Sequence, residues 1–109
     1  ALESDAGGFT PRAFSVKANP EQVSRLNSWI PLLNPYGVTE ILNMGAGADV
    51  EPLNESLGVP AAELMPDSQR YFDYHHSAAD VFEIVNKREL ELGAINMAAL
   101  VYLVDKYGF

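Results

Sequence analysis

Two adjacent histidines, His75 and His76, are the only histidines in the chain. They lie in an aromatic and acidic stretch that runs from Tyr71 to Asp80. Near neutral pH an imidazole can bind a metal ion or transfer a proton, so the pair is a candidate for a metal or catalytic site. The simpler interpretation is a pair of partly buried, hydrogen-bonded side chains. The pair by itself leaves both interpretations open.

Adjacent histidines on extended backbone form a poor chelate, because consecutive side chains of a strand point to opposite faces. At most one of His75 and His76 is therefore expected to bind a given metal ion. The other would have a separate task, such as donating a hydrogen bond to a substrate. The neighbouring aromatic side chains of Tyr71, Phe72 and Tyr74 are expected to pack in the core or to line a pocket.

Asp5 is the second candidate, in a Glu-Ser-Asp tripeptide that is followed by Gly7 and Gly8. Asp and Gly are common in turns, so an ordinary turn is the simpler interpretation. In the functional alternative, the Asp5 carboxylate leaves a strand end to bind a metal ion, and the glycines let the backbone pass close to that ion. The first five residues are typical of a chain entered partway through a strand, which predicts a piece of a longer protein.

Composition excludes several classes of protein and site. The net charge is −8, with 7 scattered basic residues against 15 acidic ones, which disfavours a nucleic-acid binder because phosphate contacts need clustered Lys and Arg. The chain has no cysteine, so disulfides and thiolate zinc sites are excluded. No apolar run approaches the roughly 20 residues that span a membrane. The length of 109 residues fits one domain.

Two of the helices that must position the candidate residues are short or uncertain in extent. Asn19, Pro20 and Gln22 form a capping box that starts a helix, and Pro31 is expected to kink or end it. A second, short helix is expected to run from an Asp49 cap to about Leu57, where Gly58 stops it. The glycines at 45 and 47 lack the third glycine of a dinucleotide fingerprint and are expected to serve the turn into that helix.

The longest helix is expected after a second capping box, Asn86–Glu89, and before Gly108. Its apolar stripe is wide, so the helix is expected to be largely buried. The stripe consists of Leu90, Ala94, Met97, Val101 and Val104, widened by Ile95, Ala98, Ala99 and Tyr102.

Strands are expected at 13–17, 38–44 and 61–65, between the helices. Strands that alternate with helices predict an α/β layered domain. Functional residues of such domains gather in loops just past the strand ends, and both Asp5 and the histidine pair would lie in such loops.

Four motifs occur together in one order, and the ordered set resembles the C-terminal part of a family M28 zinc peptidase. The resemblance is strongest to the carboxypeptidase Q-like (plasma glutamate carboxypeptidase-like) branch of dipeptidases and aminopeptidases, and it covers nearly the whole chain. It implies that residues 1–109 form a partial three-layer α/β/α domain with a mixed sheet flanked by helices. The motifs are Glu3-Ser4-Asp5-x-Gly7, Gly47-Ala48-Asp49, Tyr71-Phe72-x-Tyr74-His75-His76-Ser77-x-x-Asp80 and Arg88-Glu89-Leu90-Glu91-Leu92-Gly93.

The resemblance also implies a site with two zinc ions. Asp5 matches a ligand of one ion and His76 a ligand of the other, while His75 matches the position that stabilises the tetrahedral oxyanion. A pair of cations about 3.5–4 Å apart activates a shared water and polarises the scissile carbonyl. The second nitrogen of a ligating imidazole needs an acceptor, which Asp73 or Asp80 could supply, although a cap or turn role is equally open for both.

The chain departs from the family pattern because it lacks the early His, the bridging Asp and the Glu-Glu pair that contains the general base. The whole protein is expected to hydrolyse peptides or dipeptides, whereas the isolated chain is expected to be inactive and to bind zinc weakly at best. By resemblance, the whole protein is expected to be periplasmic or secreted. An uncovered sheet edge and helix face predict self-association of the fragment as a homo-oligomer. The alternative is a non-catalytic acidic α/β module that binds a partner protein through the loop from Tyr71 to Tyr74.

Overall fold

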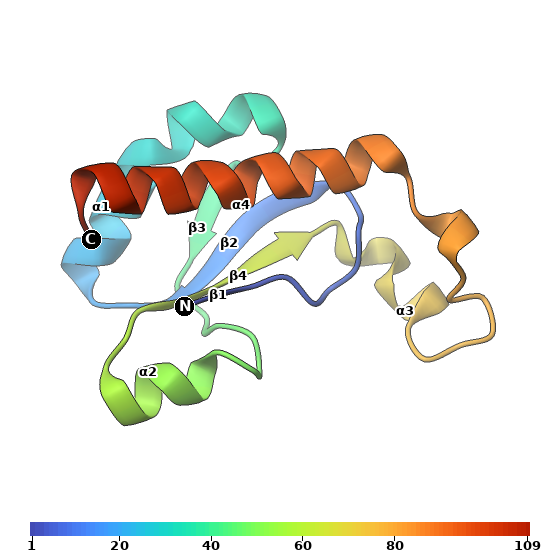
Figure 1. The fold of residues 1–109 in the computed structure, drawn as a ribbon, viewed down its shortest axis with the longest axis horizontal. Coiled ribbons are helices and arrows are strands. Elements are labelled where there is room, and N and C mark those ends of the chain that lie inside the picture. The colour runs from blue at the N-terminus through green and yellow to red at the C-terminus, as the bar shows by residue number, and fades with distance from the viewer.

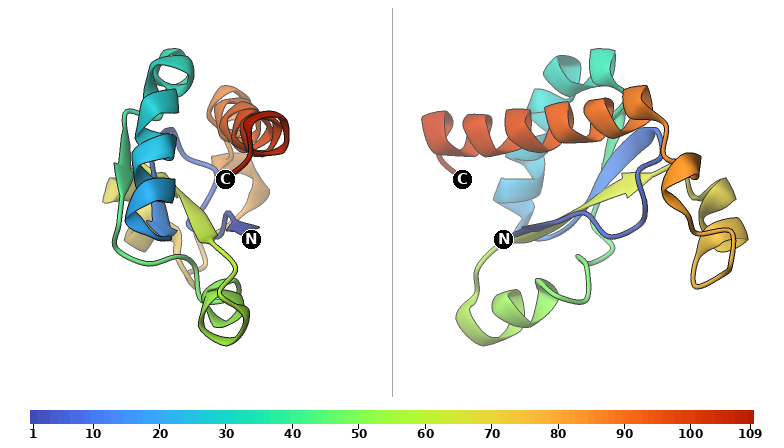
Figure 2. Two further views of the ribbon diagram at one scale, coloured as in Figure 1. Left: turned by 90° about the vertical axis from the view of Figure 1, so that its left-hand side faces the viewer. Right: turned by 45° about the vertical axis from the view of Figure 1, so that its right-hand side comes forward.

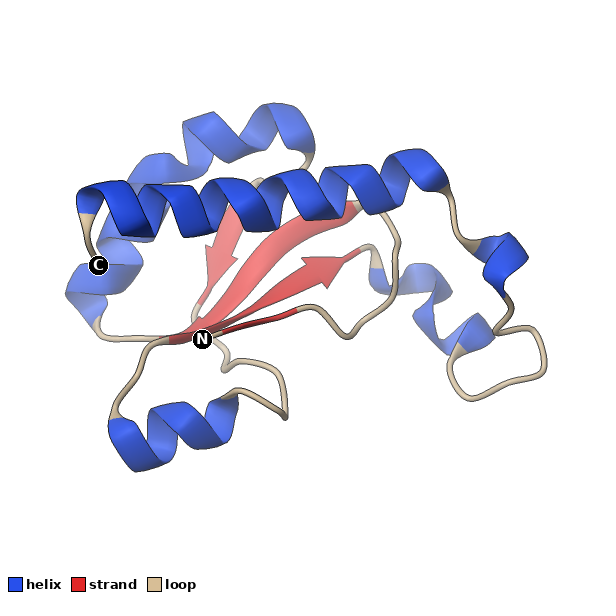
Figure 3. Cartoon of the chain, in the orientation of Figure 1, coloured by secondary structure: helices blue, strands red, loops and turns tan.

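A four-stranded mixed sheet forms the centre of the computed structural model, which describes all residues from Ala1 to Phe109. The strands follow the spatial order β1-β4-β2-β3 and are β1 (Leu2–Glu3), β2 (Pro11–Lys17), β3 (Glu40–Leu42) and β4 (Ala61–Pro66). β1 is parallel to β4 and β3 is parallel to β2, whereas β2 and β4 are antiparallel. The predicted α/β class is therefore confirmed (Figure 3), and β3 is shorter than the predicted strand at 38–44.

Helices flank this sheet on two sides. The α-helices are α1 (Pro20–Leu33), α2 (Glu51–Leu57), α3 (Tyr71–Tyr74) and α4 (Lys87–Tyr107), and the short 3-10 helices are η1 (Asn34–Tyr36), η2 (Ser68–Arg70) and η3 (Phe82–Ile84). α4 runs along one side of the sheet, and α2 lies on the opposite side (Figures 1 and 2). None of these helices combines the length and the apolar content that a membrane crossing requires.

The core lies between the sheet and the two longest helices. In β2, Phe14 and Val16 point to the same face because strand side chains alternate, and both are almost fully buried. They join one apolar cluster with Leu26 of α1, Leu64 of β4 and Leu100 of α4. α1 and α4 therefore pack on the same face of the sheet.

The start of α1 is as predicted, but its end is not. The side chain of Asn19 accepts a hydrogen bond from the Gln22 N–H at 2.9 Å, and the Gln22 side chain accepts one from the Asn19 N–H at 3.0 Å, which confirms the capping box. Pro31 was expected to kink or end the helix, and the second of these alternatives is wrong, because α1 continues to Leu33. Pro31 has no N–H to donate to the carbonyl of Asn27, and its ring crowds that carbonyl, yet only two residues of the helix follow it.

The prediction that Asp49 caps α2 is also wrong. The residue before the helix is Val50, and no side chain of its own segment caps it. The carboxylate of Glu3 in β1 instead accepts hydrogen bonds from the N–H groups of Asp49 and Val50 at 3.1 and 3.2 Å. Gly47 permits this approach, since a Cβ on it would collide with the Glu3 side chain. A strand far away in the sequence therefore caps α2.

α4 is much more exposed than its composition suggested. Its buried apolar residues are Leu100 and Leu103, whereas Leu90, Val101 and Tyr102 are each more than half exposed. The expectation of a largely buried helix is therefore wrong. The sheet covers only one face of α4, and nothing in this chain covers the rest of its apolar stripe.

Candidate functional site

Two loops at one edge of the sheet carry the residues singled out from the sequence. Residues 4–10 connect β1 to β2, and residues 67–86 connect β4 to α4. β1 and β4 are parallel, so both loops leave the sheet from the carboxyl ends of neighbouring strands. Figure 1 shows α3 and its loop at this end of the sheet. The predicted placement of the candidate residues past the strand ends is confirmed.

The structure brings Asp5, His75 and His76 to one cavity with a volume of about 260 Å³. All three side chains are exposed, so the cavity is open to solvent. Its wall contains residues from both loops. The other lining residues are Gly7, Gly8, Phe9, Tyr71, Tyr74, Asp80, Ile84 and Val85.

The two imidazoles lie face to face, with ring centroids 3.9 Å apart and an angle of 13° between the ring planes. The expectation that they point to opposite faces is wrong, because the backbone here is a turn and not a strand. His75 ends α3 and donates its N–H to the carbonyl of Tyr71 at 2.9 Å. His76 then adopts a left-handed conformation with φ of 53°, which is uncommon for a non-glycine residue. This reversal turns both rings toward the same cavity.

Aromatic side chains form much of the surroundings of the pair. Tyr71 lies beside His75 with a centroid separation of 4.7 Å, and the ring of Tyr74 is 5.9 Å from that of Phe9. Tyr71 and Tyr74 line the cavity, as predicted. Phe72 does not, since 81% of its surface is exposed, so the expectation that it packs or lines a pocket is wrong for this residue.

Asp5 lies in an acidic part of the sheet edge. Glu63 of β4 is the register partner of Glu3 in β1. Partial burial raises the pKa of Glu63, and the negative charges of Glu3 and Asp5 raise it further. The carboxyl of Glu63 therefore holds its proton more strongly than an isolated glutamate.

Gly7, which follows Asp5 closely, has φ of 88° and lies against the ring of Phe9, so a side chain there would be both strained and crowded.

The donor types in the cavity suit zinc, which binds imidazole nitrogen and carboxylate oxygen. The number of donors does not complete a site, because no group of three or more His, Asp or Glu side chains in this chain is placed to hold a metal ion. Catalytic zinc commonly has three protein ligands. Of the two suggested acceptors for a ligating imidazole, Asp80 lines the cavity and Asp73 does not.

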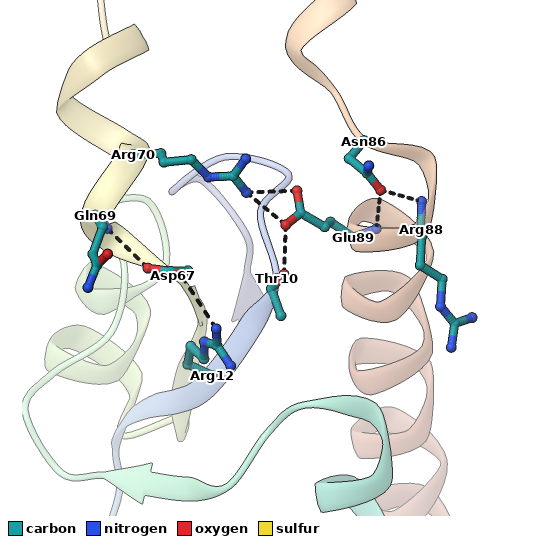
Figure 4. Close-up of polar contacts among 8 residues, drawn as sticks. All are labelled: Thr10, Arg12, Asp67, Gln69, Arg70, Asn86, Arg88 and Glu89. Atoms are coloured by element: carbon teal, nitrogen blue, oxygen red, sulfur yellow. Dashed lines mark hydrogen bonds and ion pairs between the residues drawn. The ribbon is translucent and has the colours of Figure 1, made fainter.

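Several lining residues had no signal in the sequence. Phe9, Ile84 and Val85 are ordinary apolar residues, and only the packing of two distant loops places them at the cavity. The same holds for a polar cluster beside it, in which Thr10, Arg70 and Glu89 meet (Figure 4). Glu89 was expected only to complete a capping box.

Comparison with known proteins gives relatives that match nearly all of this chain. It is 30% identical over 103 residues to carboxypeptidase Q of Homo sapiens and of Pongo abelii, and 29% identical to that of Bos taurus. Each match covers 94% of this chain and 22% of the relative, so the chain spans about a fifth of the length of these curated relatives. No family model matches the chain.

A solved structure gives the same result in three dimensions. The crystal structure of a Peptidase M28 precursor from Shewanella amazonensis SB2B superposes with a TM-score of 0.80 at 28% sequence identity. The match covers 91% of this chain and 22% of that structure's chain. The fold of this chain therefore has a counterpart in part of a known peptidase.

Proposed function

Since the chain corresponds to a fragment of an M28 peptidase, we propose that it forms one wall of the active site of a dizinc exopeptidase. Residues 1–109 would be the C-terminal segment of the catalytic domain. The whole enzyme would cleave dipeptides or N-terminal residues of peptides, in the periplasm or after secretion. The observation that carries this proposal is the single cavity that collects Asp5 and both histidines from loops far apart in the sequence.

The proposed roles follow from the chemistry of each side chain. Asp5 would be a ligand of one zinc ion and His76 a ligand of the other, with the remaining ligands and the general base outside these residues. Bound zinc supplies an activated water and polarises the scissile carbonyl. His75 stacks on His76 and is held by the end of α3, so its ring is positioned to donate a hydrogen bond to the oxyanion that develops on the substrate.

Aromatic and aliphatic side chains would shape the substrate side of the cavity. Phe9 comes from the first loop, and the second loop contributes Tyr71, Tyr74, Ile84 and Val85. Apolar walls with a few polar groups are typical of sites for small organic ligands. A peptide side chain would therefore contact these walls while Asp5, His75 and His76 face its reacting carbonyl group.

The first test is a calorimetric titration of the 109-residue chain with zinc. We expect weak binding only, because the chain provides too few ligands for either ion. One or two tight, stoichiometric zinc ions per chain would contradict the proposal. The encoded sequence before Ala1 gives an independent check, since it should contain a His-x-Asp, a later Asp and a Glu-Glu pair.

Variants of the whole enzyme separate the two kinds of role. Asp5→Asn and His76→Ala should each lower both the zinc content and the activity. His75→Ala should keep the zinc and lower kcat by about 100-fold or more, the usual effect of losing an oxyanion donor. Asp73→Asn is the matched control, because Asp73 is near the histidines in the sequence but does not line the cavity. Loss of zinc in the His75 variant would contradict the assignment.

A second candidate function has one observation in its favour. Phe72, in the loop from Tyr71 to Tyr74 that was suggested to bind a partner protein, is 81% exposed, and Phe82, outside that loop in η3, is 86% exposed. Exposed aromatic residues can anchor an interface. This non-catalytic function would be favoured if the sequence before Ala1 lacked the peptidase motifs.

A further inference from the structure

One carboxylate, that of Glu89 in the first turn of α4, joins the two loops that carry the candidate site residues (Figure 4). It accepts a hydrogen bond from the Thr10 hydroxyl at 2.7 Å, at the end of the loop that carries Asp5. It also accepts two from Nη2 of Arg70, at 2.7 and 2.8 Å, immediately before α3 and His75. No other side chain of α4 forms hydrogen bonds with both loops.

Glu89 does not make the bond that its position in the helix predicts. A Glu at the third helical position commonly bonds the N–H of the residue that caps the helix. Here the Asn86 side chain does cap α4, because it accepts from the N–H groups of Arg88 and Glu89 at 2.9 and 3.1 Å. The Glu89 side chain, however, turns away from Asn86 toward Thr10 and Arg70 (Figure 4). The capping box is therefore only half formed, and the carboxylate serves the loops.

Further contacts join the same two loops beside this carboxylate. The Arg70 guanidinium lies over the ring of Phe9, 4.6 Å from its centroid, and Phe9 is only 7% exposed. The Asp67 N–H donates to the carbonyl of Thr10 at 2.7 Å. Arg70 is thus held between a buried aromatic ring of one loop and a carboxylate of α4. Because Phe9 and Tyr74 also line the cavity, a shift at Arg70 would reach the cavity wall directly.

The electrostatics keep this junction charged at neutral pH. The hydrogen bond from Arg70, followed by that from Thr10, lowers the pKa of Glu89 below its usual value of 4.5. The same pairing raises the pKa of Arg70. Charge-assisted hydrogen bonds of this kind are shorter and stronger than neutral ones.

We propose that Glu89 is a positioning residue that holds the Asp5 loop and the His75–His76 turn at a fixed separation. The catalytic consequence of this positioning rests on the proposed function, because the separation of the loops matters for catalysis only if both loops face the same substrate. Glu89 itself does not line the cavity, so it acts through Thr10 and Arg70.

The test uses NMR spectra of the 109-residue chain, in which the two histidines are the only source of imidazole signals. We expect Glu89→Gln to shift the ring signals of His75 and His76 and to speed hydrogen exchange of the Asp67 N–H by about tenfold, because a charged hydrogen bond between the loops is lost. Glu91→Gln is the matched control on the same helix. The carboxylate of Glu91 forms a long ion pair with Lys87, at 3.8 Å, and contacts neither loop.

A second control separates positioning from general stability. Asn96 lies near the middle of α4, where its fully buried side chain donates a hydrogen bond to the carbonyl of Tyr36 at 2.8 Å. Asn96→Ala should therefore destabilise the whole fold, yet leave the imidazole signals and the Asp67 exchange of the native state unchanged. If Glu89→Gln fails to fold, Thr10→Val decides instead, since it removes one hydroxyl and should speed the same exchange. Unchanged imidazole signals in Glu89→Gln, or in Thr10→Val when that variant must decide, would overturn the proposal.

A zinc chloride titration of the same samples distinguishes this inference from the proposed function. In the unsubstituted chain, millimolar zinc should shift both imidazole signals, and Glu89→Gln should weaken that response. Imidazole signals that respond to Glu89→Gln would keep the positioning role whatever the zinc response, whereas unchanged zinc content of the whole enzyme in His76→Ala would overturn the zinc assignment. Imidazole signals that respond to zinc but not to Glu89→Gln would overturn the positioning role alone.

Discussion

At the scale of single residues, conformation decides what the histidine pair can do. On a strand the two rings would diverge, but the left-handed backbone at His76 brings them into a stack. A non-glycine residue in this region costs free energy that the surrounding structure must offset. Such a conformation is common at functional sites, which agrees with the separate roles proposed for His75 and His76.

The acidic neighbourhood of Asp5 leads to a prediction about stability. The pKa of Glu63 is raised by burial and by the charges of Glu3 and Asp5, so its ionised form is disfavoured in the folded state. Its contribution to stability is fully present below pH 4.5 and is lost as the pH rises through its folded pKa. Glu63→Gln should therefore raise the free energy of unfolding at pH 7 by less than about 1 kcal/mol, because solvent screens a partly exposed carboxylate.

Urea unfolding at pH 7 and at pH 3.5 would measure this effect. The gain from Glu63→Gln should disappear at the lower pH, where the carboxyl is protonated in both states. Glu83→Gln is the control, since Glu83 is exposed and makes no ion pair. A Glu63 variant that is less stable than the unsubstituted chain at pH 7 would contradict the prediction.

At the scale of elements, long-range contacts replace local signals at two helix starts. α2 has no cap of its own and depends on Glu3 of β1, while the Glu of the α4 capping box is used by the two loops. At α2, a distant carboxylate satisfies N–H groups near the predicted Asp49 cap. At α4, the Glu expected to complete the capping box instead binds groups in distant loops. Helix starts therefore link distant parts of this chain.

The cap on α2 can be tested by removing it. Glu3→Ala should lower the free energy of unfolding by about 1 kcal/mol, the typical effect of losing a helix cap. Hydrogen exchange at Asp49 and Val50 should become faster, because their N–H groups lose the Glu3 carboxylate. Glu21→Ala is the control, since Glu21 lies in the first turn of α1 without a bond to a backbone N–H. Equal effects of the two variants would refute the capping role of Glu3.

At the scale of the whole molecule, the chain leaves an apolar groove uncovered. The groove has a volume of about 550 Å³ and lies between the edge strand β1, the start of β4 and the second half of α4. Val101 and Phe109 line it and are 57% and 40% exposed. An exposed apolar patch beside an unpaired strand edge favours association. This surface is the physical basis for the expected homo-oligomer.

We therefore expect the 109-residue chain to self-associate at high concentration, and light scattering would measure its mass. Val101→Lys should reduce the association by placing a charge in the groove. Leu57→Lys is the matched control, because Leu57 is 71% exposed on α2 but lies outside the groove. A monomer at every concentration would contradict the expectation.

Local patterns in the sequence were enough to determine the elements and the candidate residues. The Asn19 capping box, the strand at 13–17 and the glycine at 58 depend on neighbours a few residues away, so the sequence alone predicts them. The motifs around Asp5 and the histidine pair likewise identified the two loops. Burial of α4 was not predictable, since hydrophobicity shows which residues avoid water but not whether a partner surface is present.

Only the tertiary structure decided which groups meet at the site. The cap that Glu3 provides and the contacts of Glu89 with Thr10 and Arg70 join residues that the parallel pairing of β1 and β4 brings together. Long-range contacts of this kind leave no period or spacing in the sequence. The residue types were therefore sufficient to suggest the chemistry, whereas their arrangement around one cavity required the packed sheet.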